Sequence, residues 1–193
     1  MHLPKVILAS VSPRRRELLR SLEIDFEVAP SDAEEAHHEP LTVREISQLN
    51  AYRKARAVAK KHPDALVLGA DTLVHLDGRL LGKPANAGEA AEMLSYLQGK
   101  THEVVTGVCL LQLREHRQKL FAETTFVTFH PMTAAEIERY LFLVNTLDKA
   151  GAYAIQEQGE LIVREIAGSF SNVVGLPVER LRAELARWGA SEP

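Results

Sequence analysis

The stretch "VILASVSPRRRELL" (residues 6–19) decides how the fold begins. Its first four residues are apolar, and a run of that length is typical of a short buried strand. Pro13 suits the first position of a helix, and Ser12 directly before it suits the N-cap. The stretch therefore predicts a strand followed at once by a helix, whose apolar face begins at Leu18 and Leu19.

The first turn of this helix carries charge of the wrong sign for the helix dipole, because three cationic side chains occupy it: Arg14, Arg15 and Arg16. Free N–H groups at a helix start attract anions, and a guanidinium group matches the oxygens of a phosphate. Ser10 and Ser12 place two hydroxyls beside the same turn. We therefore predict a phosphate site; the alternative is that the arginines are solvated or paired with Glu17 and neighbouring acids.

The composition indicates one globular domain over residues 1–193, since 46% of the residues are hydrophobic and 25% are charged. The formal net charge of −3 argues against a nucleic-acid polymer as partner. No apolar segment approaches the ~20 residues that cross a bilayer, and no signal peptide is evident, so no membrane partner is expected. The single cysteine, Cys109, excludes an intrachain disulfide and fits a reducing compartment, which predicts a cytoplasmic protein.

Periodicity predicts a mixed α/β chain in which helices flank a mixed sheet. Besides the first helix, helices are expected at residues 42–61, 86–97, 133–144 and 177–188. Strands are expected at residues 6–9, 26–29, 65–76, 101–113, 119–132 and 160–168. A capping box of Thr42 and Glu45 opens the second helix, and Asp77 with Gly78 forms a hairpin turn into a short return strand.

Four kinds of residue are candidates for chemistry. Asp71 ends an apolar strand, where its carboxylate either holds a divalent ion, takes a proton from water or merely caps a turn. Glu34 and Glu35 lie in an acidic loop that is otherwise simply solvated. Lys54, among small residues of a helix, and Lys83, between a glycine and a proline, are natural counter-charges for a triphosphate.

The segment "DKAGAYAIQ" (residues 148–156) is rich in small side chains that allow close approach of a flat ligand. The amide of Gln156 offers a donor and an acceptor to a nucleobase edge, although a tight buried turn explains the segment equally well. The sequence contains neither a P-loop nor a dinucleotide fingerprint. No histidine or cysteine cluster has zinc spacing, and the adjacent His37 and His38 are interpreted as structural or solvated loop residues.

Seven motifs occur in the order and approximate spacing of one known family: SVSPRR (10–15), RKA (53–55), LGADT (68–72), GKP (82–84), THEVVTG (101–107), DKAGAYAIQ (148–156) and GSFSNVVGLP (168–177). On these motifs the sequence resembles the Maf family of nucleoside triphosphate pyrophosphatases, from about Lys5 to the last helix. The resemblance implies an inosine triphosphate pyrophosphatase-like fold, with a long curved mixed sheet and two lobes around a central cleft. It also implies hydrolysis to a nucleoside monophosphate and pyrophosphate, dependence on Mg²⁺ or Mn²⁺, and a homodimer.

The resemblance also implies roles for single residues. Ser10, Ser12, Arg14 and Arg15 would bind the phosphates, and Lys54 and Lys83 would neutralise them. Asp71 would accept the proton of the attacking water, and Glu35 together with Asp71 would bind the metal. Two departures from the family pattern are Arg53, where an acidic residue is usual, and the loop sequence AEE, which leaves Glu34 and Glu35 as alternatives.

Thr72 after the aspartate, together with residues 148–156, resembles the branch that takes dTTP and UTP, with CTP and modified pyrimidine nucleotides as further substrates. Arg14, Thr72 and Gln156 would set that preference. One alternative is a 7-methyl-GTP pyrophosphatase, although that branch tends to carry glutamine at the position of Thr72. Another alternative is a nucleotide-sensing regulator of cell division, which would need the arginines but no catalytic base.

Overall fold

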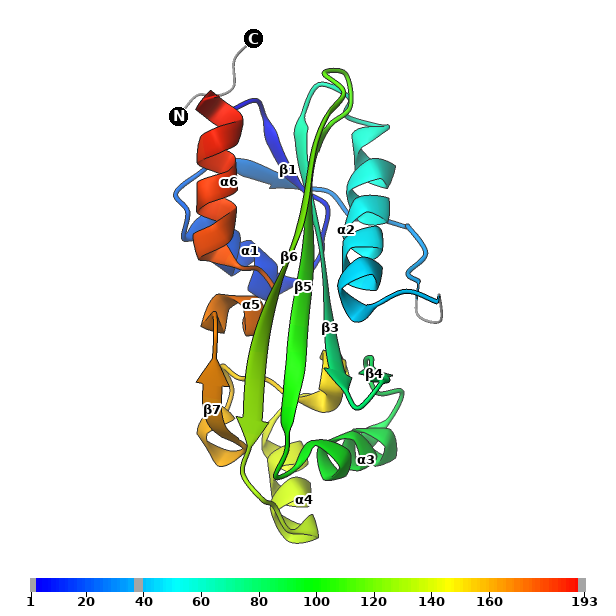
Figure 1. Cartoon of the computed structure of the whole chain (residues 1–193), viewed down its shortest axis with the longest axis vertical. Coiled ribbons are helices and arrows are strands. Elements are labelled where there is room, and N and C mark those ends of the chain that lie inside the picture. Colours follow the sequence, from blue (N-terminus) through cyan, green and yellow to red (C-terminus); the bar gives the residue numbers. More distant parts are fainter. Residues whose placement is uncertain (1–2, 37–39, 191–193) are drawn as a thin grey trace. The chain divides into compact units, whose positions relative to one another are not determined.

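The computed structural model describes residues 3–36 and 40–190 (Figure 1). The helices are α1 (Pro13–Arg20), α2 (Val43–Ala59), α3 (Ala87–Leu97), α4 (Ala134–Leu143), α5 (Phe170–Val174) and α6 (Val178–Ala190). The strands are β1 (Val6–Leu8), β2 (Phe26–Val28), β3 (Leu66–Leu76), β4 (Arg79–Leu81), β5 (Thr101–Gln112), β6 (Arg117–Phe129) and β7 (Val163–Ala167). None of the helices in this described part is long and apolar enough to span a bilayer. His37 and His38 lie outside the described residues.

The strands form one seven-stranded sheet in the order β2-β1-β3-β5-β6-β7, with β4 paired to β3. β1 runs parallel to β2 and to β3, so that Ile7 lies opposite Glu27 on one side and Val67 on the other. β4 is antiparallel to β3, and β7 is antiparallel to β6. The expected mixed α/β fold, a mixed sheet flanked by helices, is confirmed.

The chain forms two compact units. Unit 1 comprises the described residues of Met1–Asp71, Thr106–Glu123 and Gly175–Pro193. Unit 2 comprises Thr72–Val105 and Thr124–Val174. The long strands β3, β5 and β6 contribute residues to both units.

Within unit 1 the alternation of strand side chains builds a core on each face of the sheet. Leu8 and Leu68 pack on one face in a cluster that includes residues of α1 and α6. Ile7 and Val67 pack on the other face against α2. Figure 1 shows α2 and α6 on opposite sides of these strands. Because successive residues alternate in this way, the odd-numbered positions of β3 in this unit face α2.

Two glycines bring α2 unusually close to the sheet. A Cβ atom on Gly69 of β3 would lie 2.2 Å from the carbonyl oxygen of Ala51. A Cβ atom on Gly107 of β5 would lie 2.3 Å from the carbonyl oxygen of Ser47. Only glycine permits such contact between helix backbone and strand. Asp71, two residues beyond Gly69, therefore shares the face of β3 against which α2 is pressed.

The core of unit 2 encloses polar groups that are paired with each other. The Tyr140 hydroxyl donates to the Ala154 carbonyl at 3.2 Å and accepts from the Ala154 N–H at 3.0 Å. His102 Nε2 lies 2.9 Å from the Tyr153 hydroxyl. The 3₁₀ turn Ala150–Ala152 includes Gly151 with φ of 70°. Residues 151–154 are buried in this tight turn, and Gln156 beyond it is exposed.

The local signals at helix starts predicted the boundaries well. Ser12 accepts a hydrogen bond from the Arg15 N–H, and the capping box of Thr42 and Glu45 is complete. The strand predicted over residues 160–168 was partly wrong, because Gly159–Leu161 forms a 3₁₀ turn and β7 begins only at Val163. Ile162, directly after that turn, is fully buried in the core of unit 2. Its apolar side chain therefore reflects burial in the core and not membership of a strand. The short helix α5 was not predicted.

Candidate active site

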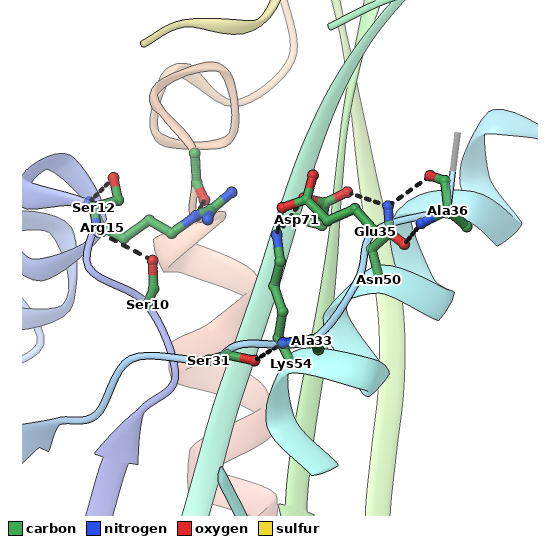
Figure 2. A network of polar contacts seen from close by, with 11 residues as sticks. Ser10, Ser12, Arg15, Ser31, Ala33, Glu35, Ala36, Asn50, Lys54 and Asp71 are labelled. Atoms are coloured by element: carbon green, nitrogen blue, oxygen red, sulfur yellow. Dashed lines mark hydrogen bonds and ion pairs between the residues drawn. The ribbon is translucent and has the colours of Figure 1, made fainter. Parts of the chain in front are cut away.

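Lys54 lies between two carboxylates in unit 1. Its Nζ is 2.7 Å from Asp71 Oδ1 and 2.7 Å from Glu35 Oε1. The Asp71 side chain is only 6% exposed and that of Lys54 13%, whereas Glu35, in the loop before α2, is 38% exposed. Figure 2 shows the three charged groups converging from a strand, a helix and a loop. A buried carboxylate needs ion-pair and hydrogen-bond partners of this kind, because burying the charge without them is costly.

Asn50 completes this cluster from one turn earlier on α2. Its Nδ2 donates to Asp71 Oδ2 at 2.9 Å and to the Ala36 carbonyl at 3.1 Å. Its Oδ1 accepts the Ala36 N–H at 2.7 Å. Asn50 is fully buried. Both oxygens of Asp71 are therefore occupied by donors of α2, Lys54 on one and Asn50 on the other.

The start of α1 is organised by two serines and one arginine of unit 1. Ser12 Oγ accepts the Arg15 N–H at 3.5 Å, and Ser10 Oγ accepts the Ser12 N–H at 3.2 Å. The Arg15 side chain turns away from the helix, and its Nε donates to the Gly175 carbonyl at 2.9 Å. Figure 2 shows the guanidinium group of Arg15 directed toward the side of Asp71.

The charge of Arg15 at the start of α1 interacts with the carboxylates beside Lys54. Burial lowers the pKa of Arg15, while the negative charges of Asp71 and Glu35 act to raise it and the positive charge of Arg14 acts to lower it. Arg15 and Lys54 thus both interact with the two carboxylates, Asp71 and Glu35. Interacting buried charges of this kind are frequent at functional sites.

The residues predicted from the sequence divide between the two units. Unit 1 contains Ser10, Ser12, Arg14, Arg15, Glu35, Lys54 and Asp71. Unit 2 contains Thr72, Lys83 and Gln156, of which Lys83 and Gln156 are exposed. Of the two alternative loop carboxylates, Glu35 is the one that pairs with Lys54. The presence of Arg53, where an acid is usual, does not prevent Lys54 from forming its two ion pairs.

Sequence reasoning missed Asn50. The one available signal was its position four residues before Lys54, on the helix face that otherwise carries the small residues Ala51 and Ala55. A buried polar residue on an apolar helix face needs partners, but the sequence does not say where they come from.

The same carboxylates were tested as a possible metal site. No three His, Cys, Asp or Glu side chains among residues 3–36 and 40–190 form a metal-binding group. Mg²⁺, however, is commonly bound by one or two carboxylates together with substrate phosphates. Asp71 and Glu35 both reach one cation, the ammonium group of Lys54, at 2.7 Å. This hard oxygen donor pair fits a divalent ion that completes its coordination with phosphate oxygens and water.

Comparison with solved structures places the fold in a known class. The Staphylococcus aureus Ham1 protein matches with a TM-score of 0.55 and 18% identity, covering 95% of this chain and 99% of that chain. A HAM1 protein from Coxiella burnetii matches with a TM-score of 0.52 and 14% identity, covering 96% and 100%. At these identities the likeness concerns the fold alone. The chain therefore has a Ham1-like mixed α/β fold.

The family follows from sequence comparison. The family model described as "Maf-like protein" matches residues 5–188. The chain belongs to the Maf family, as its motifs predicted. The dTTP/UTP pyrophosphatase of Bacillus cytotoxicus is 48% identical, covering 97% of this chain and 98% of the relative. The dTTP/UTP pyrophosphatase of Carboxydothermus hydrogenoformans is 45% identical, covering 96% and 99%.

Proposed function

We propose that this protein is a nucleoside triphosphate pyrophosphatase that cleaves dTTP and UTP between the α and β phosphates. CTP and modified pyrimidine nucleotides are proposed as further substrates. The names and near-complete coverage of its relatives support this assignment. The observation that carries it is Lys54, which holds Asp71 and Glu35 within 2.7 Å of one ammonium group in the unit that also contains Arg15.

The proposed chemistry uses each of these groups. The start of α1 and the guanidinium groups of Arg14 and Arg15 bind phosphate oxygens. Asp71 accepts a proton from a water molecule whose oxygen attacks phosphorus. The anhydride bond then breaks, and its electron pair goes to the leaving group, which is pyrophosphate for attack at the α phosphorus and the monophosphate for attack at the β phosphorus. Lys54 pairs with Asp71 and offsets the charge that develops on the phosphate oxygens.

A divalent ion is part of this proposal. Glu35 and Asp71 would hold Mg²⁺ or Mn²⁺, and the ion, when bound, neutralises phosphate oxygens of the substrate. The match in charge supports this, because a nucleoside triphosphate brings up to about four negative charges next to two carboxylates, which a divalent cation would offset. Removal of the ion with a chelator is expected to abolish turnover.

Three residues of unit 2 enter the proposal on the strength of the family motifs. Lys83 is proposed to neutralise the phosphate chain, and Thr72 and Gln156 are proposed to select the pyrimidine base together with Arg14. The reaction is proposed to take place in the cytoplasm, which the single free and buried cysteine, Cys109, supports.

A nucleotide panel tests the proposal. Pyrophosphate release is measured for dTTP, UTP, CTP, GTP and 7-methyl-GTP, with Mg²⁺, with Mn²⁺ and with a chelator, and the nucleotide product is identified by mass. We expect dTTP and UTP to be cleaved well ahead of GTP, with monophosphate as the product. Cleavage of 7-methyl-GTP ahead of all others would overturn the substrate assignment. Tight nucleotide binding without pyrophosphate release would favour the regulatory sensor instead.

A further inference from the structure

The carboxamide of Asn50 is the most completely used polar group of the cluster. Both of its N–H donors and its oxygen are engaged: Nδ2 donates to Asp71 Oδ2 and the Ala36 carbonyl, and Oδ1 accepts the Ala36 N–H. The two bonds to Ala36 close a ring between one side chain and one backbone residue. A fully satisfied buried network of this kind fixes the positions of its members.

Only an amide in this orientation satisfies the surroundings. Rotating it by 180° would set its oxygen against the carbonyl of Ala36 and the carboxylate of Asp71, which are both acceptors. Aspartate at this position has the same shape but no donors, and it would add a negative charge beside Asp71. Leucine has the same branching, with two methyl groups in place of the amide oxygen and nitrogen, and makes no hydrogen bonds. The chemistry of the side chain, and not only its size, therefore determines the contacts.

These contacts join the acidic loop to α2 and β3. Ala36 directly follows Glu35, and it is 4% exposed although it has no helix or strand of its own. Anchoring the backbone of Ala36 determines where the Glu35 side chain starts, and Glu35 then reaches Lys54 Nζ. At the same time Asn50 restrains Asp71 through Oδ2, which leaves Oδ1 for Lys54. One side chain thus sets the spacing of both carboxylates.

We propose that Asn50 is a positioning residue for the reaction: its carboxamide anchors Ala36 and Asp71 together, so that Glu35 and Asp71 present their oxygens to one cation. This inference rests on the proposed function in so far as the cation is the metal ion of that reaction. The anchoring itself is a property of the ligand-free protein and is measurable without any substrate.

Two variants and one matched control test it. Asn50→Asp replaces donors by acceptors at constant shape, and Asn50→Leu removes the hydrogen bonds while keeping the branching of the side chain. The control is Ser47→Ala, because Ser47 is also fully buried on α2 but donates only to the carbonyl of Arg44, within its own helix, at 2.9 Å. A general loss of helix packing would appear in the control as well as in the Asn50 variants.

The first readout is hydrogen exchange of the Ala36 amide in ligand-free protein, followed by NMR. Because this N–H is bonded to Asn50 Oδ1, we expect its exchange to become at least about tenfold faster in both Asn50 variants and to stay unchanged in Ser47→Ala. The second readout is binding of Mn²⁺ followed by electron paramagnetic resonance, for which we expect about 10–100-fold weaker affinity in the Asn50 variants.

The third readout is steady-state hydrolysis of dTTP. We expect kcat to fall about 10–100-fold at a fixed metal concentration, and KM for dTTP to change less than about threefold, since the groups of α1 are untouched. Unchanged exchange of Ala36 together with unchanged Mn²⁺ affinity would overturn the inference. If the wild-type protein hydrolyses no nucleotide, the proposed function fails, and the exchange and Mn²⁺ data still decide the role of Asn50 by themselves.

Discussion

Two buried lysines in this molecule have similar ion-pair surroundings, but they differ in how far their acidic partners are buried. Lys54 in unit 1 and Lys149 in unit 2 are both largely buried, and each ammonium group faces two carboxylates. The partners of Lys149, Asp148 at 2.9 Å and Glu157 at 3.4 Å, have side chains that are 51% and 50% exposed. Lys54 instead pairs at 2.7 Å with Asp71, whose side chain is 6% exposed.

This difference separates a lysine with solvent-exposed acidic partners from one that, in the proposed mechanism, pairs with the catalytic carboxylate. Lys149 also donates to the backbone carbonyl of Asn145, and water screens its acidic partners. Its side-chain contacts link residues on both sides of the turn Ala150–Ala152. Lys54 controls a carboxylate that water screens little, and electrostatic interactions are strongest in such surroundings. Burial of the anion, more than burial of the lysine, marks the reactive cluster.

The largest expected effect comes from the buried anion itself. Asp71→Asn keeps the shape of the side chain and removes the proton acceptor, so we expect kcat for dTTP to fall about 10³-fold. Binding of a non-hydrolysable dTTP analogue, measured by calorimetry, is expected to change less than about threefold. Turnover close to that of the wild type would show that Asp71 is not the base.

Exchanging both lysines for methionine compares them directly. Lys54→Met leaves Asp71 and Glu35 facing each other, and we expect kcat to fall about 10²-fold and the free energy of unfolding to fall by about 3 kcal/mol. Lys149→Met removes hydrogen bonds from a loop, and we expect a loss of about 1–3 kcal/mol. The kcat of Lys149→Met is expected to stay within about threefold, with any further effect in KM through Gln156. Equal losses of kcat would remove the distinction between the two lysines.

A buried histidine of unit 2, His102, extends the contrast, because burial favours its neutral form. Burial lowers the pKa of His102 from 6.5 to about 4. The unfolded chain takes up this proton near pH 6.5, so the stabilising effect is complete above that pH and is lost as the pH falls from 6.5 to 4. The loss amounts to about 3 kcal/mol of unfolding free energy over that window.

Urea denaturation at pH 7 and pH 4.5 measures this contribution. His102→Gln is neutral throughout and retains a group that can pair with the Tyr153 hydroxyl. The variant is therefore expected to lose about 2 kcal/mol less than the wild type between the two pH values. Identical pH dependence of the two proteins would mean that folding does not lower the pKa of His102.

The smallest expected effect concerns the scaffold that carries Lys54 and Asn50. Gly69→Ala would place a methyl group 2.2 Å from the Ala51 carbonyl, so α2 must shift away from β3, and we expect a loss of about 1–3 kcal/mol. Gly82→Ala is the control, since no atom lies within 4 Å of its added Cβ. Chemical denaturation measures both, and the control is expected to stay within about 0.5 kcal/mol of the wild type. A stable Gly69→Ala would contradict close contact of helix and strand.

Local signals predicted most of the fold because they act over a few residues. Ser12, Pro13 and the capping box at Thr42 each set a helix start by contacts within one turn. The turn at Gly159 was missed because Ile162 is apolar for reasons of tertiary burial, which an apolar run cannot distinguish from a strand.

The candidate site was only partly predictable. Asp71 and Lys54 stood out as charged residues at the end of a strand and on a helix with small neighbours. The choice of Glu35 over Glu34 depends on where an irregular loop is anchored, and the anchor, Asn50, is fourteen positions from Ala36 in the chain. No periodic pattern in the sequence predicts the contact between Asn50 and Ala36. The contact of Asn50 with Asp71 depends in addition on the close packing of α2 on β3, which Gly69 allows.

The most direct test of the central claim is a crystal structure with Mn²⁺ and a dUTP analogue whose α,β bridge resists hydrolysis. We expect the phosphates to contact Arg14, Arg15 and the N–H groups at the start of α1. We also expect the ion to contact oxygens of Asp71 and Glu35. A triphosphate bound away from α1, with Lys54 still closing both carboxylates and no ion beside them, would contradict this claim.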